Sequence, residues 1–358
     1  MKSFAKALLK ILKLTGIALL SAIILILAVH FVGSMINRRT PDGGINESMY
    51  VEINGVKQWI NIYSEDINNP VLLYLHGGPG SATSDIDYVI TRKWADVYTV
   101  VTWDQRNCGK SYDTKQNDIV LTKDLLMQDG KEITEFLLDY MDKEKITILG
   151  HSWGTFYGAN LVLTYPEYYD CFIGTGQLVD MVENETVFKE EAHKWAEGDD
   201  EALALVEQLT PEDFTMEHIT ARNALMEKYG YSMMVDGSDY NLLTTILFNP
   251  NYSVIDWVKY FQRDMGVYLE FFNSDELRAF SLKGRLDYEV PYFNINGDKD
   301  YQTNFNLAQE YFDEIKAPYK QMIIMKDTTH GLLESKSEEF SEIVHEIADL
   351  TLQNYENH

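Results

Sequence analysis

The sequence predicts an α/β fold in which a mostly parallel, doubly wound sheet carries a helical cap insertion and follows one N-terminal transmembrane helix. Three observations predict it. Short apolar runs at residues 71–76, 97–104 and 145–150 alternate with helical patterns. This alternation stops between residues 179 and 285, where helix-forming residues, tyrosine and methionine predominate. Finally, residues 14–37 contain no Lys, Arg, Asp or Glu.

Residues 1–39 are expected to form a membrane anchor. A helix of about 20 apolar residues crosses a hydrocarbon core of roughly 30 Å. Four lysines precede the apolar run and two arginines follow it. The positive-inside rule therefore predicts a single-pass membrane protein with its amino end in the cytoplasm and its folded domain on the extracytoplasmic side. A cleaved secretory signal and a buried helix of a soluble domain are the alternatives, although no clear A-x-A cleavage site follows the run.

The remaining elements follow from apolar periodicity. Residues 49–63 predict two antiparallel strands joined by a turn at Asn54–Gly55. Continuous apolar runs fit strands that are covered on both faces, as in a parallel sheet. Such strands are expected at 71–76, 97–104, 145–150, near Cys171, at 290–297 and at 321–325, with helices over 124–141 and 340–352. The predicted division is an anchor (1–39), a first part of the sheet domain (40–178), a cap (179–285) and a second part (286–358).

Charge and cysteine content exclude some functions. The chain carries a formal net charge of −26, and residues 40–358 alone hold 24 basic and 56 acidic residues. A surface this acidic repels phosphates, so nucleic acid is excluded as a partner. The two cysteines, Cys108 and Cys171, cannot form a zinc site. Whether they form a disulfide is left open by the sequence.

A nucleophile is predicted at Ser152. The segment Gly150–Gly154 reads G-x-S-x-G, directly follows an apolar strand and precedes a segment compatible with a helix. This strand–turn–helix context is the one in which the motif presents an exposed serine hydroxyl. The turn is so sharp that its flanking positions require small residues, which explains Gly150 and Gly154.

A base and a carboxylate are predicted after the insertion. His330 falls on a loop that follows the strand at 321–325, where a neutral imidazole can accept the serine proton. Asp300 and Asp298 both follow the strand at 290–297. Asp300 is preferred as the partner of the imidazole, and Asp298 is expected to shape the turn.

The oxyanion is expected to bind two backbone N–H groups. One belongs to Trp153, the residue after the nucleophile, and the other to Gly78, in the glycine-rich loop after the strand at 71–76. No metal or organic cofactor is required by this mechanism.

Three motifs together resemble the prolyl aminopeptidase (proline iminopeptidase) family of α/β-hydrolases. They are HGGPG (76–80), DQRNCGKS (104–111) and GHSWGT (150–155). The resemblance implies a helical cap over the active site and release of N-terminal residues, often proline, from short peptides. It also implies that acidic cap residues hold the ammonium of the substrate.

The chain departs from that family in the cap. Where some members carry an ARIE-type stretch, Ala221–Ala224 reads ARNA and lacks the glutamate. Glu183, Glu185 and Glu227 are acidic alternatives, and no substrate-binding residue is assigned.

The expected function is a serine hydrolase of the aminopeptidase type that acts on small peptides. A carboxylesterase that uses the same residues on small esters is the alternative, and a non-catalytic binding module is a third hypothesis. A serine at the nucleophile position disfavours an epoxide hydrolase.

Overall fold

The computed structural model describes residues 2–234, 237–264 and 266–356. Within these residues it contains one eight-stranded sheet with the order β1-β2-β4-β3-β5-β6-β7-β8. The strands are β1 (Ile45–Ile53), β2 (Val56–Ser64), β3 (Val71–Leu75), β4 (Thr99–Asp104), β5 (Ile146–His151), β6 (Tyr169–Thr175), β7 (Tyr292–Gly297) and β8 (Lys320–Met325). Strand β2 runs antiparallel to both β1 and β4, and the other neighbours are parallel. The expected hairpin forms, with Ile53 opposite Val56.

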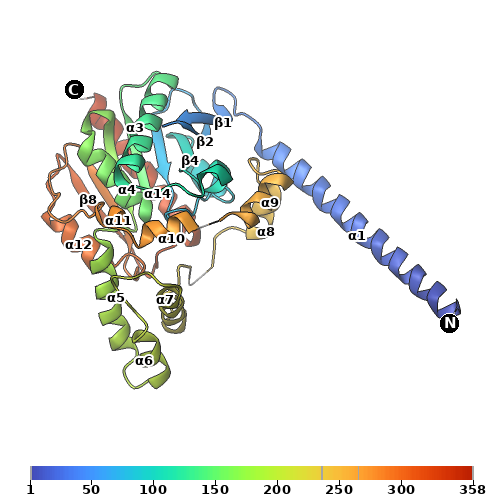
Figure 1. The fold of residues 1–358 in the computed structure, drawn as a ribbon. Coiled ribbons are helices and arrows are strands. Elements are labelled where there is room, and N and C mark those ends of the chain that lie inside the picture. Colours follow the sequence, from blue (N-terminus) through green and yellow to red (C-terminus); the bar gives the residue numbers. More distant parts are fainter. Residues whose placement is uncertain (1, 235–236, 265, 357–358) are drawn as a thin grey trace.

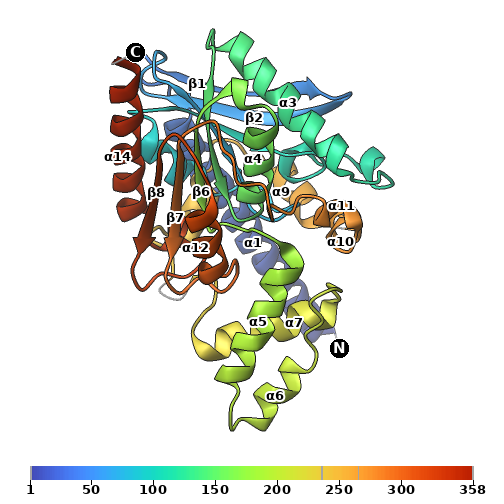
Figure 2. The ribbon, with the colours of Figure 1, turned by 90° about the vertical axis from the view of Figure 1, so that its left-hand side faces the viewer.

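Helices cover both faces of this sheet (Figure 2). The main ones are α3 (Lys123–Tyr140), α4 (Trp153–Thr164), α12 (Phe305–Glu314) and α14 (Ser337–Glu356), with short helices α2 (Tyr88–Thr91) and α13 (Leu332–Ser335). Successive residues of β3 point to opposite faces, so that Leu73 and Leu75 pack with α3 and α4 while Leu72 packs with α14. The last helix extends three residues before the start expected from its apolar pattern, because Ser337 to Glu339 add a polar first turn.

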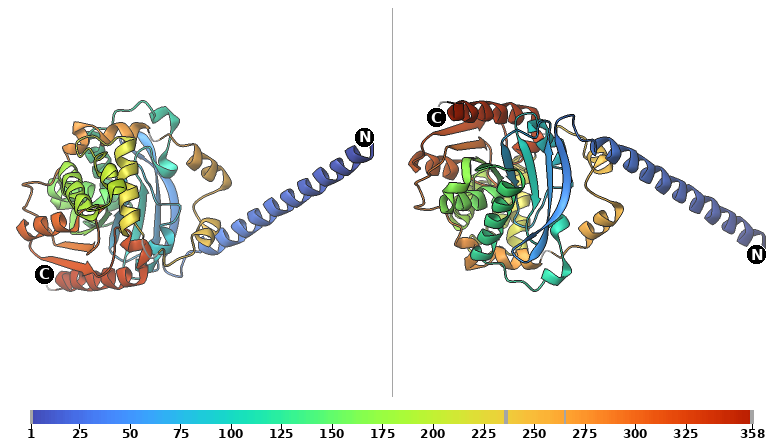
Figure 3. Two further views of the ribbon diagram at one scale, coloured as in Figure 1. Left: turned by 90° about the horizontal axis from the view of Figure 1, so that it is seen from below. Right: turned by 90° about the horizontal axis from the view of Figure 1, so that it is seen from above.

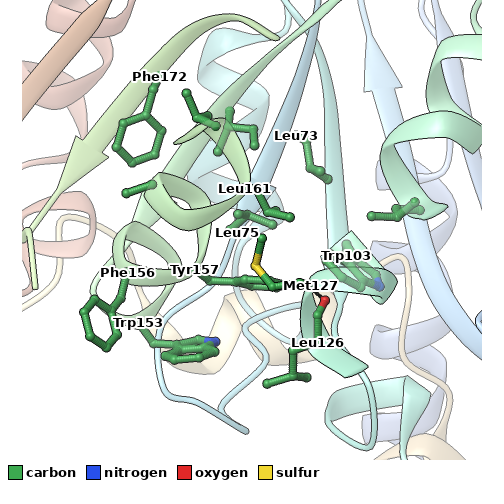
Figure 4. Packing of buried hydrophobic residues seen from close by; sticks show 14 of the residues in the cluster. Leu73, Leu75, Trp103, Leu126, Met127, Trp153, Phe156, Tyr157, Leu161 and Phe172 are labelled. Carbon is green, nitrogen blue, oxygen red and sulfur yellow. Dashed lines mark hydrogen bonds between the residues drawn. The ribbon is translucent and has the colours of Figure 1, made fainter. Parts of the chain in front are cut away.

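The larger of the two cores that flank the sheet lies between β3 and the helices α3 and α4 (Figure 4). Trp153 and Tyr157 of α4 stack with ring centroids 5.7 Å apart, and Trp103 of β4 packs beside Tyr157. Helix α3 begins where Thr122 accepts the N–H of Leu125, which satisfies a donor of the first turn. This packing fixes α4, the helix that follows the Ser152 turn.

The DQRNCGKS segment supports the sheet from below the site. Arg106 forms a buried, two-pronged ion pair with Asp129 of α3. Ser111 donates to the carbonyl of Asp104 at 2.5 Å and accepts the N–H of Trp59. The contacts of the DQRNCGKS segment are therefore structural.

Cys108 is buried, as is Cys171, and both are free thiols rather than a disulfide.

Between β6 and β7 the described chain forms a series of helices, the first of which lie below the sheet domain while others lie at its right-hand side (Figure 1). They are α5 (Met181–Trp195), α6 (Asp200–Val206), α7 (Met216–Tyr229), α8 (Leu242–Phe248), α9 (Val254–Gln262), α10 (Gly266–Phe272) and α11 (Asp275–Arg278). Helices α5, α6 and α7 share a small core of their own around Phe188, Val206 and Leu225.

The N-terminal helix α1 (Lys2–Asn37) projects from the globular part (Figures 1 and 3). Its segment Lys6–Asn37 is long and apolar enough to cross a membrane, and only 6% of its most apolar window is buried. A core helix of a soluble protein would be mostly buried. Within the described residues, the carboxyl end of α1 packs on α8.

Candidate active site

The Ser152 turn is strained in the way its sequence predicts. Strand β5 ends at His151 and α4 begins at Trp153, so that Ser152 alone makes the turn, with a φ of 55°. Such a left-handed backbone costs a non-glycine residue about 1–3 kcal/mol. A Cβ added at Gly150 would lie 2.2 Å from the carbonyl oxygen of Gly154, and one added at Gly154 would lie 2.0 Å from that of Leu75. Only glycine fits at either position.

Asp300 and His330 form a buried pair. The Nδ1 atom of His330 lies 2.8 Å from Oδ2 of Asp300, to which it donates. The other carboxylate oxygen of Asp300 accepts the backbone N–H groups of Gln302 and Thr303 at 2.9 and 3.0 Å. These bonds fix the carboxylate and stabilise its negative charge. Asp298 points elsewhere, accepting the N–H of Thr328 at 3.4 Å.

Two contacts bring His330 to the Ser152 turn. Its ring packs against that of His151, the residue before Ser152, with centroids 4.8 Å apart. A Cβ added at Gly176 would lie 2.9 Å from Cε1 of His330, and the preceding residue, Thr175, accepts the N–H of Ser152 at 3.0 Å. Among the described residues no hydrogen bond joins Oγ of Ser152 to His330. Catalytic hydrogen bonds of this kind commonly tighten only when substrate binds.

The glycine-rich loop lies against the same turn. Gly78 has a φ of 119°, a conformation that favours glycine, and it lines one cavity together with Ser152 and Trp153. Trp153 opens α4, where N–H groups lack an acceptor within the helix.

The side chain of His76 stabilises the glycine-rich loop through two hydrogen bonds. Its Nε2 accepts the N–H of Gln105 at 3.3 Å, so its Nδ1 carries the proton and donates to the carbonyl of Gly77 at 2.7 Å. Burial lowers the pKa of His76 to about 4, which keeps this arrangement at neutral pH.

The cavity above Ser152 has a volume of about 260 Å³. Much of its wall is apolar and comes from the helical segment between β6 and β7, including Met181, Phe214, Ile219 and Phe272. Its polar lining comes from two sources, the helices α5 and α7 and the loop after Asp300. These polar residues are Asn184, Glu185, His218, Arg222, Asn223, Gln302 and Thr303. Sequence reasoning had singled out Glu185 and the ARNA stretch among them, but not Asn184, His218, Gln302 or Thr303, which carry no motif.

Glu185 lies in the cavity wall with its charge compensated. One carboxylate oxygen accepts from Nε of Arg222 at 2.8 Å and from Nε2 of His218 at 3.1 Å. Burial opposes its ionisation, but Arg222 and His218 outweigh burial and hold the pKa of Glu185 below its ordinary value. Nδ1 of His218 accepts the N–H of Thr210, so the imidazole is neutral and donates through Nε2. The cluster as a whole is therefore electrically neutral.

The other two acidic candidates lie outside the cavity. Glu183 pairs with Lys283 at 2.9 Å on the surface, and Glu227 is exposed on α7. Arg222, the second residue of the ARNA stretch, donates instead to Gln302 and to the carbonyl of Tyr301. Arg222 thus ties α7 to the loop that follows Asp300.

Comparison with known proteins identifies the family. Residues 70–336 match the model of the alpha/beta hydrolase fold. The chain belongs to this family. The α/β-hydrolase fold expected from the sequence is thus confirmed, and the chain is a hydrolase.

The curated relatives of this α/β-hydrolase include peptidases. A probable aminopeptidase, YbaC of Bacillus subtilis, is 24% identical over 301 residues, which are 78% of this chain and 89% of the relative. The proline iminopeptidase of Saccharolobus solfataricus is 32% identical over 130 residues, which are 36% of this chain and 38% of the relative. The expected resemblance to prolyl aminopeptidases is confirmed.

Solved structures share the fold at low identity. The proline iminopeptidase of Mycobacterium smegmatis superposes with a TM-score of 0.58 at 19% identity, covering 85% of this chain and 98% of the other. A bacterial membrane phospholipase A has a TM-score of 0.58 at 16% identity and covers 98% of this chain and 99% of its own.

Proposed function

We propose that this hydrolase is a membrane-anchored serine aminopeptidase of the prolyl aminopeptidase type, which cleaves short peptides through an acyl-enzyme on Ser152. The observation that carries the proposal is the buried Asp300–His330 pair, 2.8 Å apart, packed against the strained Ser152 turn, which lines a cavity of about 260 Å³. A serine, a base and a carboxylate from three separate loops make up the constellation that acyl transfer uses.

The proposed reaction has two steps. The Oγ atom of Ser152 attacks the carbonyl carbon while Nε2 of His330 takes the hydroxyl proton, and the N–H groups of Gly78 and Trp153 bind the oxyanion. The proton then passes to the leaving amine as the C–N bond breaks. Water attacks the acyl-enzyme and gives a proton to His330. His330 then returns that proton to Oγ of Ser152 as the ester bond breaks and the acid is released. Asp300 holds the imidazole in the tautomer with the proton on Nδ1 and stabilises its cation.

A fluorophosphonate probe, which reacts with activated serines, tests this proposal. Wild-type protein is expected to be labelled and Ser152→Ala not to be. Asp300→Asn should slow labelling and peptide turnover by about 10³- to 10⁴-fold, since the tautomer of His330 is no longer fixed. Asp298→Asn is the matched control and should behave like wild type. Equal labelling of wild type and Ser152→Ala would refute the mechanism.

A second candidate, a carboxylesterase, is favoured by the neutral Glu185 cluster. An aminopeptidase must bind a substrate ammonium, and a glutamate already paired with Arg222 attracts a cation less strongly than a free one. Turnover of an aminoacyl-naphthylamide is to be compared with that of a nitrophenyl ester of an uncharged acid. Faster cleavage of the amide by at least about tenfold in kcat/KM supports the peptidase, and the reverse order supports the esterase.

Membrane attachment is part of the proposal. Helix α1 is long and apolar enough to span a bilayer, and by the positive-inside rule the lysines at 2, 6, 10 and 13 favour an orientation with its amino end in the cytoplasm. The hydrolase domain then lies on the extracytoplasmic side, where small peptides or esters are its substrates.

A further inference from the structure

Helices α8 and α9 expose an unusual number of large apolar side chains. We define the apolar face as Leu242 and Leu243 of α8 with Val254, Ile255, Val258 and Phe261 of α9. Phe261 is 80% exposed, Ile255 68% and Leu243 67%. In α9 the apolar positions follow i, i+1, i+4 and i+7, which lie on one side of a helix. Contiguous apolar patches of this kind mark sites of interaction.

The other side of α9 is held by the hydrolase domain. Trp257 packs on Tyr252 with ring centroids 4.7 Å apart, and Tyr252 is buried. Asp256 caps the amino end of α9 through Ser253 and lies 3.5 Å from the ammonium of Lys110. The contacts of Trp257 and Asp256 with the hydrolase domain thus fix the orientation of α9, so that its apolar side chains point to the outside.

This face lies directly beside the carboxyl end of α1. Side chains of α1 and of the residue after it donate to three carbonyls at the end of α8 and just beyond it. The bonds run from His30 to Leu247 at 2.8 Å, from Asn37 to Phe248 at 2.9 Å and from Arg38 to Pro250 at 2.7 Å. The Phe248 ring fills the space that a Cβ at Gly33 would need. Figures 1 and 3 show α8 and α9 at the point where α1 meets the domain.

We propose that the apolar face of α8 and α9 is immersed in the interfacial layer of the membrane that α1 crosses, so that α1 and this face together hold the hydrolase domain flat on the bilayer. The proposal rests on the proposed span of α1. Two hydrogen bonds fix the end of α8 against the last two turns of that span, and a third joins the residue after α1 to Pro250, just beyond α8. This is the depth at which a helix leaves the hydrocarbon. An amphipathic helix at this depth buries its apolar side among headgroups and acyl chains.

Burial of apolar surface, and not charge, must drive this contact. Residues 40–358 carry 32 more acidic than basic residues, so an anionic lipid surface repels the domain. The contact is therefore expected on zwitterionic phosphatidylcholine and in high salt alike.

Site-specific fluorescence on the full chain in phosphatidylcholine vesicles tests the proposal. Ile255→Cys and Phe261→Cys are labelled with the polarity-sensitive dye NBD. Both native cysteines are buried, and unsubstituted protein serves to show that they do not react. Leu350→Cys is the matched control, an exposed leucine on α14 at the side of the domain away from α1. We expect blue-shifted emission and quenching by spin-labelled lipid at 255 and 261, and neither at 350.

A fourth variant, Leu25→Cys within α1, separates this proposal from the proposed anchor. Quenching at 25 together with water-like emission at 255 and 261 would overturn the immersion of the apolar face and leave the anchor intact. Absence of lipid quenching at all positions would refute both. A blue shift at 255 and 261 without lipid quenching, growing with the ratio of protein to lipid, would mean that a second copy of the chain covers the face, and would also overturn the proposal.

Discussion

At the scale of single residues, two polar groups of the cavity differ in their surroundings: the hydroxyl of Ser152 is accessible, whereas the carboxylate of Glu185 is buried and fully hydrogen-bonded. Ser152 is half-buried and faces the cavity, whereas Glu185 is buried and bonded to Arg222, His218 and Asn184. A buried ion pair whose partners are all satisfied contributes specificity, and breaking it leaves an uncompensated charge. Glu185 therefore organises the cavity wall, because it joins α5 to α7.

This role predicts how stability depends on pH. Since the folded-state pKa of Glu185 lies below its ordinary 4.5, the stabilisation is present above that value and is lost as pH falls through the depressed pKa. At about pH 7, Glu185→Gln should reduce the free energy of unfolding by about 2 kcal/mol. As the pH falls below about 4.5 and through the depressed pKa of Glu185, the difference in the free energy of unfolding between wild type and variant should close, because wild type then loses its charge and the variant has none. Denaturant unfolding in detergent at a series of pH values measures the free energy of unfolding of both proteins. A difference between them that does not change with pH would contradict this role of Glu185.

At the scale of elements, the connection between α8 and α9 links α1 to the glycine-rich loop. Asn249 is buried there and makes four hydrogen bonds. Its amide donates to the carbonyls of Ser84 and Asp85, a few residues beyond Gly80, and its oxygen accepts the N–H groups of Asn251 and Tyr252. One side chain thereby ties the end of α8 to the segment that continues from the proposed oxyanion loop.

Asn249→Ala should therefore weaken both stability and turnover. Leaving buried donors and acceptors unsatisfied costs about 1–3 kcal/mol each, so a fall of at least about 3 kcal/mol in the free energy of unfolding is expected. Turnover of a small ester should fall as well, since the loop that carries Gly78 loses its support. Thr244→Ala is the control, because that exposed hydroxyl bonds only to Asn241 in its own helix. A melting temperature for Asn249→Ala equal to that of the control would contradict this role.

At the scale of the whole molecule, the basic residues beside α1 predict an orientation for the proposed anchor. Six basic and no acidic residues lie in 1–39, four of them before the apolar run and two after it. If α1 spans the membrane as proposed, the positive-inside rule predicts that the lysine-rich end stays in the cytoplasm and that the hydrolase domain is translocated.

Cysteine labelling of intact cells checks that topology. Glu144→Cys, at an exposed turn before β5, should react with a membrane-impermeant maleimide. Lys6→Cys should react only after the membrane is made permeable. Labelling of Lys6→Cys but not Glu144→Cys in intact cells would show the opposite orientation.

Local sequence determined much of this protein. The strands of the parallel sheet and the Ser152 turn follow from patterns only a few residues long, because apolar runs, glycines and sharp turns are governed by neighbouring atoms. The motifs at 76–80, 104–111 and 150–155 were sufficient for the family. Sequence also reduced the choice of carboxylate to Asp298 or Asp300, two positions apart on one loop, and favoured Asp300.

Only the tertiary structure decided what depends on distant segments. It brings Asp300, not Asp298, to the imidazole of His330, pairs Glu185 with Arg222 from another helix, and seats α8 against the end of α1. None of these contacts leaves a periodic or local signal, because each joins residues separated by about 30 to more than 200 positions. The physical reason is that local preferences select the elements, whereas packing and the pairing of buried charges select which side chains meet.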